Sequence, residues 1–370
     1  MRDLIKLLAL IFAISFYSCQ KQNGYVITGN LTGFPDSTMI YLRNLSTDET
    51  FDSTMIIGNQ FLLSGQLQDE PEQIWLNTRI DNKFLYTNLL IGNERVKIVG
   101  DISDFPWNVK ITGSKSQDDF NYLRDLTKSY DVKRDSLVQR FLKLTPEEQQ
   151  EKGKEIWGEI RTLDDTTHEL RVGYVKTYIN TYPGVINLGY LKNSLHKDTV
   201  QALYDKLTDE LKACKFAKIV EVFLNEKISE IGDNYHDFNA INKNGDTIKF
   251  SDLAGNKYIL LNFTAAYCGP CVQSAEELRL IDKTFNDSIT IVSFSGDSKK
   301  DFWLKSLERD SVSWLSLWDG KGTYSETYIK YGVEGFPTYY LIDPEGKITD
   351  KWSGYGKGSL EARLQRLINK

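Results

Sequence analysis

The sequence predicts an α/β domain at its C-terminal end, preceded by a β-sandwich-like domain and a helical middle region. Short alternating apolar runs fill residues 25–113, apolar residues at helical spacing follow as far as residue 231, and a buried strand leading into a helix occupies residues 258–285. Period-two runs are typical of strands, and a period of about 3.6 is typical of helices. The predicted boundaries are 1–18 for a signal peptide, 19–113 for the β-domain, 114–231 for the helical region and 232–370 for the α/β domain.

The first residues have the pattern of a secretory signal. Met1–Lys6 is charged, Leu7–Phe16 is almost wholly apolar, and the small residue Ser18 precedes Cys19. The apolar run is short for a membrane-spanning helix. Because it ends on cysteine, the segment resembles a bacterial lipoprotein signal, cleaved before Cys19, whose thiol would carry the lipid. The alternative is an ordinary signal peptide with a chance cysteine, and both predict an exported protein.

Residues 20–24 would form a short polar tether from Cys19 to the β-domain. No acidic cluster follows Cys19, and such clusters mark surface export in some Gram-negative lipoproteins. We therefore expect a lipid-anchored protein that faces the periplasm, where disulfides persist.

The β-domain is predicted from several short apolar runs separated by turn residues. Gly58-Asn59 and Gly92-Asn93 are two such turns, and this rhythm favours a sandwich or open barrel. The runs are 25–29, 39–42, 60–64, 74–76, 96–99 and 109–111.

The middle region has long apolar stripes at helical spacing. Thr145-Pro146-Glu147-Glu148 predicts a helix start, because it combines an N-cap, a proline at the first position and a capping box. We expect Tyr182-Pro183-Gly184 to close that helix. A later stripe predicts one amphipathic helix in which Cys214 is a packing residue. Its members are Leu203, Leu207, Leu211, Cys214, Ala217, Val220, Leu224 and Ile228.

Two cysteines separated by Gly-Pro carry the chemistry of the C-terminal domain. The apolar run Tyr258–Thr264 predicts a buried strand, and the helical pattern begins at Cys268. At a helix N-terminus, unpaired N–H groups and the helix dipole favour a thiolate, which is the form that attacks a disulfide. Cys271 lies three residues later, close enough to displace what Cys268 has captured. We expect Cys268 to be the more exposed and the attacking thiol.

Two further segments extend this pattern. Val333–Asp343 contains Gly-Phe-Pro-Thr before a predicted strand, and Asp237–Gly255 is an approach segment ahead of the buried strand. With the cysteine pair, these segments resemble the thioredoxin superfamily over about residues 231–370, and in particular its membrane-anchored TlpA/ResA branch. The resemblance implies a central mixed sheet flanked by helices, a Cys268–Cys271 redox disulfide, and a cis peptide bond before Pro337.

The same resemblance assigns the rest of the site. Pro337 would act beside the cysteines, and Tyr267, Phe336 and Thr338 would bind the partner. The β-domain in turn resembles a domain of unknown function often found ahead of such modules in Gram-negative lipoproteins, through its strand rhythm and the phrase Ile111-Thr112-Gly113-Ser114.

Three positions depart from the family pattern. Tyr267 replaces the usual tryptophan, and Asn262 stands where ordinary thioredoxins have a buried aspartate. Ser274 stands where the anchored branch commonly has a glutamate. Helical spacing points Glu276 and Glu277 elsewhere, so the group that relays protons to Cys271 is left open.

Other classes of function fit less well. A metal site needs more ligands, and the three histidines, His168, His196 and His236, all precede the cysteine pair. We expect no metal and no cofactor. A formal charge of −6 without a basic face argues against nucleic acid. A thiol peroxidase would need an arginine near Cys268; Thr264 is close, but no arginine lies between the motif and Arg279.

The sequence therefore predicts an envelope thiol-disulfide oxidoreductase that reduces disulfide-containing envelope proteins and is recharged by a membrane electron donor. The alternatives are a binding lipoprotein that captures a ligand through its β-domain, with the thioredoxin fold as a scaffold, and a thiol peroxidase-like enzyme.

Overall fold

The computed structural model describes residues 24–47, 49–67 and 70–368. The predicted signal peptide, residues 1–18, and Cys19 lie outside the described residues. The chain divides into two compact units. The first unit comprises the described residues up to Arg43 together with Thr50–Tyr122. The second comprises Asn44–Glu49 together with the described residues from Leu123 onward. Within the described ranges, no helix is both long enough and apolar enough to cross a membrane.

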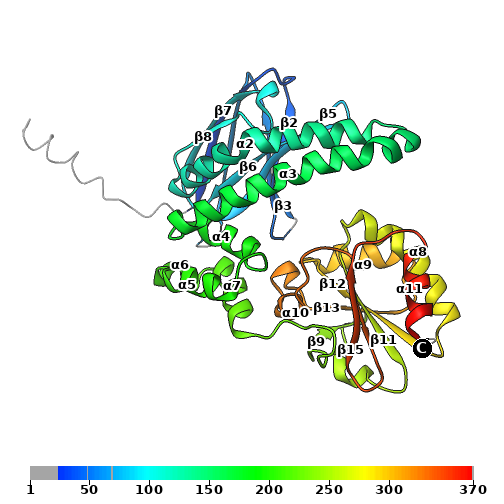
Figure 1. The fold of residues 1–370 in the computed structure, drawn as a ribbon. Coiled ribbons are helices and arrows are strands. Elements are labelled where there is room, and N and C mark those ends of the chain that lie inside the picture. The colour runs from blue at the N-terminus through cyan, green and yellow to red at the C-terminus, as the bar shows by residue number, and fades with distance from the viewer. Residues whose placement is uncertain (1–23, 48, 68–69, 369–370) are drawn as a thin grey trace, which may run out of the picture. The chain divides into compact units, whose positions relative to one another are not determined.

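The first unit contains two four-stranded sheets (Figure 1). In the first sheet, β1 pairs with β7 in parallel and with β4 in antiparallel orientation. Its strands, in spatial order, are β4 (Gln60–Gly65), β1 (Tyr25–Thr32), β7 (Arg95–Asp101) and β8 (Lys110–Thr112). The second sheet has the order β3 (Glu49–Ile56), β2 (Thr38–Asn44), β5 (Glu72–Ile80) and β6 (Lys83–Ile91). The short helix η1 (Ile102–Asp104) joins β7 to β8.

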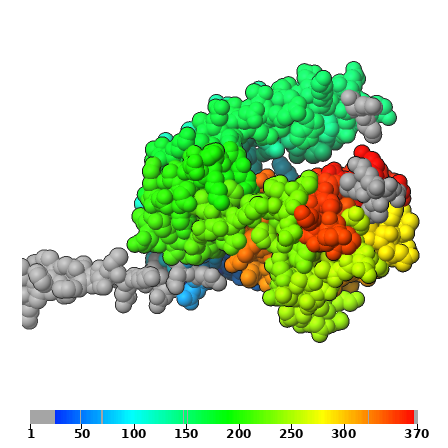
Figure 2. All heavy atoms as spheres, turned by 60° about the horizontal axis from the view of Figure 1, so that its bottom comes forward, coloured from blue at the N-terminus to red at the C-terminus, as the bar shows by residue number. Residues whose placement is uncertain are grey.

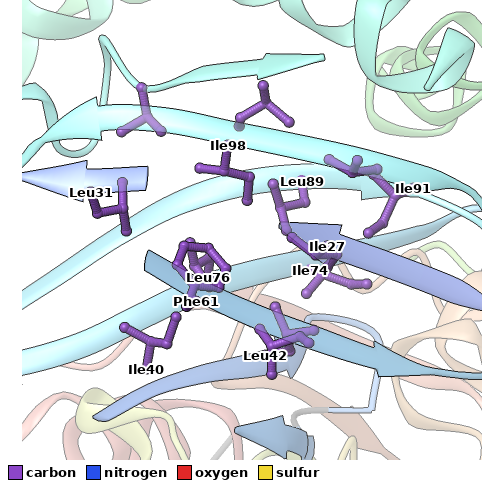
Figure 3. Packing of buried hydrophobic residues seen from close by; sticks show 14 of the residues in the cluster. Ile27, Leu31, Ile40, Leu42, Phe61, Ile74, Leu76, Leu89, Ile91 and Ile98 are labelled. Carbon is purple, nitrogen blue, oxygen red and sulfur yellow. The ribbon is translucent and has the colours of Figure 1, made fainter. Parts of the chain in front are cut away.

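A single apolar core fills the space between these sheets (Figure 3). Ile27 and Ile98 come from the first sheet, and Ile74 and Leu89 come from the second; each is almost fully buried. In the first sheet their neighbours Thr28 and Lys97 are exposed, as the alternation of a half-buried strand requires, whereas in the second sheet Leu90, beside Leu89, is also buried. The sandwich predicted from the strand rhythm is confirmed. Sequence analysis identified no run corresponding to β3 or β6.

Two long helices follow, α2 (Lys115–Leu142) and α3 (Pro146–Tyr178). They pack through Leu137, Ile156 and Ile160. The capping box at Thr145 is confirmed, since Glu148 N–H donates to Thr145 Oγ1 at 3.3 Å and Thr145 N–H donates to Glu148 Oε2 at 3.0 Å.

The shorter helices that follow differ from the sequence prediction in two places. Tyr182-Pro183-Gly184 opens α4 (Tyr182–Leu191) rather than closing α3, with Thr181 as the N-cap. The stripe 203–228 is not one helix, because Thr208 and Cys214 act as N-caps that divide it. Its segments are α5 (Lys197–Asp205), α6 (Asp209–Ala213) and α7 (Lys215–Asn225). Cys214 is buried, as the packing prediction requires.

The C-terminal domain has one seven-stranded mixed sheet. The three central strands β13, β12 and β11 are parallel, and β14 and β15 add antiparallel strands beyond β11. In spatial order the strands are β10 (Thr247–Lys249), β9 (Asn239–Ile241), β13 (Leu315–Trp318), β12 (Ile289–Ser295), β11 (Tyr258–Thr264), β14 (Thr338–Ile342) and β15 (Ile348–Ser353). The helices of the domain are η2 (Phe250–Leu253), α8 (Gly269–Thr284), α9 (Lys300–Arg309), η3 (Gly322–Tyr324), α10 (Glu326–Lys330) and α11 (Ser359–Ile368).

Helices cover both faces of this sheet. On one face, α8 and α11 lie side by side (Figure 1). Leu278 of α8 and Leu364 of α11 belong there to one buried cluster with Leu260 and Tyr339. On the other face, Tyr328 of α10 joins an aromatic core around the strands. The predicted thioredoxin-like arrangement, a mixed sheet flanked by helices, is confirmed. It places the ends of β11 and β12 beside the start of α8.

Candidate functional site: a disulfide at the start of a helix

Cys268 and Cys271 form a disulfide at the point where β11 gives way to α8. Cys268 is the N-cap of α8, and its Sγ accepts the main-chain N–H of Cys271 at 3.1 Å. An N–H group aimed at this sulfur, together with the positive end of the helix dipole, stabilises a thiolate once the bond is reduced. The sequence predicted this position for the first cysteine.

The expected difference in exposure between the two cysteines is wrong for the disulfide form. Cys268 is 7% exposed and Cys271 is 5% exposed. The loop before β14 contributes to this burial, since Phe336 packs against the cluster that Ala265, Cys268 and Cys271 form. The two cysteines therefore differ in their position on α8 and not in their burial.

The covering loop is fixed by its own hydrogen bonds. The Phe336–Pro337 peptide bond is cis, as predicted. Thr338 Oγ1 donates to the carbonyl of Gly335 at 2.8 Å and lies 2.7 Å from Ser353 Oγ. The side chain of Thr338 is therefore buried and holds the loop, so it does not face outward toward a partner.

Tyr267 forms an exposed aromatic rim beside the disulfide. Its side chain is 59% exposed, and its ring meets that of Phe336 edge-on, with 6.3 Å between centroids. The structure thus brings Tyr267, Cys268, Cys271, Phe336 and Pro337 together in one site.

Both main-chain polar groups of Ala266, just before this rim, are hydrogen-bonded to side chains. Its N–H donates to both carboxylate oxygens of Asp297 at 3.1 Å, and its carbonyl accepts from Arg309 Nη1 at 2.7 Å. Asp297 is buried and also accepts from Ser295 Oγ at 2.7 Å. Arg309 forms a bidentate ion pair with Asp310, and these hydrogen bonds raise the pKa of the Arg309 guanidinium.

Neither Asp297 nor Arg309 was predicted from the sequence. A signal for Asp297 was present, because it lies two residues after the end of β12, and the carboxyl ends of adjacent parallel strands meet at one edge of a sheet. Arg309 had no comparable signal, since it lies at the far end of α9 and reaches Ala266 only in the folded domain.

Neutral polar groups lie on the sheet face that α8 covers. Asn262 is buried and donates through Nδ2 to Ser293 Oγ at 3.1 Å, which also accepts from Trp314 Nε1 at 2.8 Å. Ser274 donates its hydroxyl to the carbonyl of Cys271 at 2.8 Å. Burial raises the pKa of the nearby Tyr339 phenol well above its usual value, so this group stays neutral.

Glu277 points away from the cysteines, as its helical position predicted. Its carboxylate accepts the N–H groups of Gly358 at 3.0 Å and Glu361 at 2.8 Å, and so caps the start of α11. Burial and the hydrogen bond to Glu277 raise the pKa of Tyr355 to about 12. In the part of the chain that the structure describes, no three His, Cys, Asp or Glu side chains gather to hold a metal ion.

A dithiol at a helix start, covered by a cis-proline loop on this mixed sheet, defines a thioredoxin-like thiol-disulfide oxidoreductase. Residues 231–351 match the AhpC/TSA family. The chain is 30% identical over 130 residues to thiol-disulfide oxidoreductase ResA of Bacillus subtilis (strain 168), a match that covers 35% of this chain and 70% of ResA. It therefore belongs to the ResA-like thiol-disulfide oxidoreductases.

Two further proteins are similar to the same region. Thioredoxin-like protein YneN of Bacillus subtilis (strain 168) is 28% identical over 122 residues, covering 32% of this chain and 69% of that protein. The solved structure of a thiol-disulfide oxidoreductase from Bacteroides fragilis is 28% identical with a TM-score of 0.34, covering 37% of this chain and all of that one. Residues 25–120 match a domain of unknown function, DUF4369.

Proposed function

We propose that this protein reduces disulfides of other envelope proteins through the Cys268–Cys271 dithiol. The observation that carries the proposal is the disulfide at the start of α8, with Cys268 as N-cap and Phe336 of the cis-proline loop packed over it. Thioredoxin, which has the same Gly-Pro between its cysteines, has a reducing potential of about −270 mV. This comparison favours a reductant.

The exchange proceeds in two balanced steps. The Cys268 thiolate attacks one sulfur of the partner disulfide, forming a mixed disulfide and releasing the other partner sulfur as a thiolate. The Cys271 thiolate then attacks Cys268 Sγ, which releases the reduced partner and restores the Cys268–Cys271 bond. Two electrons pass from the dithiol to the partner, and each partner sulfur takes up a proton.

The partner would lie along the loop that covers the disulfide. The main chain at Phe336 would hold an extended segment next to Cys268, and Tyr267 would form the adjacent wall. Exposed main chain that pairs with an extended peptide gives affinity without a strong demand on sequence.

The cellular setting belongs to the same proposal. Residues 1–18 would direct export, Cys19 would carry the lipid, and the protein would face the periplasm from the membrane. A membrane electron donor would reduce the Cys268–Cys271 bond after each cycle. Bacterial lipoproteins carry more than one acyl chain, which gives stable retention.

Insulin reduction tests the activity, with Cys268→Ser as the control. The reduced protein should precipitate insulin B chains, and the variant should not. Wild-type protein without activity would contradict the proposal and favour a binding lipoprotein. Peroxide consumption, measured in the same preparations, tests the thiol peroxidase alternative. Arg309 does not support that alternative, because its guanidinium is hydrogen-bonded to Ala266 and Asp310.

A further inference from the structure

The second unit contains a cavity of about 360 Å³ between the helical region and the C-terminal domain. Helices α4 and α7 form one side, and η3, α10 and the chain leading to the cis-proline loop form the other. Lining residues include Gly189, Lys192, Phe216, Tyr324, Val333 and Glu334. In Figure 2, the green surface that includes α4–α7 adjoins the orange surface that includes α10.

The two walls are joined by specific contacts. Ser229 N–H donates to the carbonyl of Lys330 at 2.9 Å, and the Lys330 ammonium lies 3.4 Å from the Glu226 carboxylate. The rings of Phe216 and Tyr324 meet with 6.4 Å between centroids. The helical region is therefore docked on α10, and the cavity is a built feature of this unit.

The cavity lies near the dithiol site. Val333 and Glu334 line it and precede Phe336, which packs against the disulfide cluster, by three and two residues. Tyr328 also lines the cavity, and its ring lies 5.5 Å from that of Phe336. An extended chain advances about 3.3 Å per residue. A polypeptide lying along Phe336 with its cysteine at Cys268 would bring a side chain a few residues away to the cavity mouth.

The lining indicates what kind of side chain fits. Aromatic and aliphatic groups dominate, including Phe216, Ile219 and Ile329. Lys192 stands among them and donates to the carbonyl of Gly189 at 3.2 Å. An ammonium has three N–H donors, so it can also bond a carbonyl of an entering chain. A large apolar side chain gains about 25 cal/mol for each Å² that it buries here, whereas an extra charge would face both Lys192 and Glu334.

We propose that this cavity receives a large apolar or aromatic side chain of the partner polypeptide, close in sequence to its disulfide cysteine, so that α4 and α7 select substrates. This inference rests on the proposed function. It gives the helical region a role in substrate recognition.

Gly189→Leu tests the proposal by filling the cavity. A Cβ at Gly189 would have as its nearest neighbour the Phe216 carbonyl oxygen, at 4.0 Å, so the new side chain has room. Gly173→Leu, on the exposed side of α3 where a Cβ would meet nothing within 4 Å, is the matched control. Ile219→Trp fills the same cavity from α7 if the first variant does not fold.

The substrates are short peptides whose single cysteine is linked to 5-thio-2-nitrobenzoate, with Trp or Ala two residues before or after the cysteine. Each reduction releases one coloured thiolate. Wild-type and Gly173→Leu proteins should reduce a Trp peptide about tenfold faster than the Ala peptide in at least one of the two positions. Gly189→Leu should bring that ratio close to one, while its rate with the small disulfide 5,5′-dithiobis(2-nitrobenzoate) stays unchanged.

Equal rates for all peptides with the wild type, or a preference that survives in both filled variants, would overturn the inference while the proposed function stands. Failure of the wild type to reduce even the small disulfide would overturn the proposed function itself. The two failures are therefore distinguishable.

Discussion

The buried carboxylate of Asp297 accepts the main-chain N–H of Ala266, two residues ahead of Cys268, at 3.1 Å from each of its oxygens. Arg309 donates to the carbonyl of Ala266, which belongs to the next peptide group, at 2.7 Å. The turn that presents Cys268 is thus fixed by one residue after β12 and one at the end of α9. Both act on the position of Cys268 without touching its sulfur in these contacts.

Asp297→Ala should loosen this turn. It leaves the Ala266 N–H without its acceptor, which costs about 1–3 kcal/mol of unfolding free energy. Insulin reduction should also slow, because Cys268 is less well placed. Urea denaturation measures the first effect and turbidity the second. Asp297→Asn retains one acceptor and should recover part of both losses.

Glu308→Ala, on the exposed side of α9, is the matched control for removing a carboxylate. It should leave both quantities near wild type. If Asp297→Ala behaved like this control, the positioning role of Asp297 would be wrong.

Glu277→Gln should lower the unfolding free energy without slowing insulin reduction. The amide has one oxygen where the carboxylate has two, so one of the N–H groups of Gly358 and Glu361 loses its acceptor. We expect the unfolding free energy to fall by about 1–2 kcal/mol and the insulin reduction rate to stay within about twofold of wild type. A large loss of rate at unchanged stability would make Glu277 a proton relay after all.

The chemistry-bearing segments could be predicted because their signals are local. Tyr258–Thr264 is a continuous apolar run, and its predicted limits are those of β11. The cysteine pair and Gly-Phe-Pro-Thr each occupy a few consecutive residues, and the capping box at Thr145 is complete within four. In such cases the sequence contains all the interactions that determine the local structure.

Other features depend on distant partners and were missed. The strand β3 alternates weakly and is mostly half-exposed, so its sequence has little strand character. The stripe 203–228 was predicted as one helix because apolar spacing persists across Thr208, although this residue caps a new helix through Leu211 N–H. The contact between Arg309 and Ala266 spans 43 residues, and only the folded sheet brings them together.

The contribution of Lys192 to the unfolding free energy should depend on pH. Burial in the cavity wall lowers the pKa of its ammonium, and the attraction of Glu334 opposes this in part. Between the lowered pKa and the unfolded value of about 10.4, the unfolded chain binds more protons, so stability rises with pH. At neutral pH the charged side chain therefore costs free energy in the folded protein.

Lys192→Met removes that cost. Its stability relative to wild type should be greatest near pH 7 and should shrink as the pH approaches about 10.4, as measured by urea denaturation across this range. Lys176→Met, on the exposed side of α3, reports the effect of losing a solvent-facing charge. A Lys192→Met difference that does not change with pH would contradict the assignment.

Gly184→Ala should destabilise the start of α4. A Cβ there would lie 2.3 Å from the carbonyl oxygen of Tyr178. Relieving this contact requires a backbone shift, which costs roughly 1–3 kcal/mol. Gly173→Ala meets nothing within 4 Å and should stabilise α3 by up to about 1 kcal/mol. Thermal denaturation of the two variants should shift in opposite directions, and a Gly184→Ala midpoint at or above that of wild type would contradict the close approach of Gly184 to Tyr178.

The most direct test of the central claim is a covalent trap. Reduced Cys271→Ser protein is mixed with a disulfide-containing protein, quenched with acid and mapped by mass spectrometry. Cys268 attacks but has no resolving thiol in this variant, so we predict a stable mixed disulfide at Cys268 and little adduct in a matched Cys268→Ser sample. An equal or greater yield at Cys271 in the Cys268→Ser protein, or no adduct in either variant, would contradict the account.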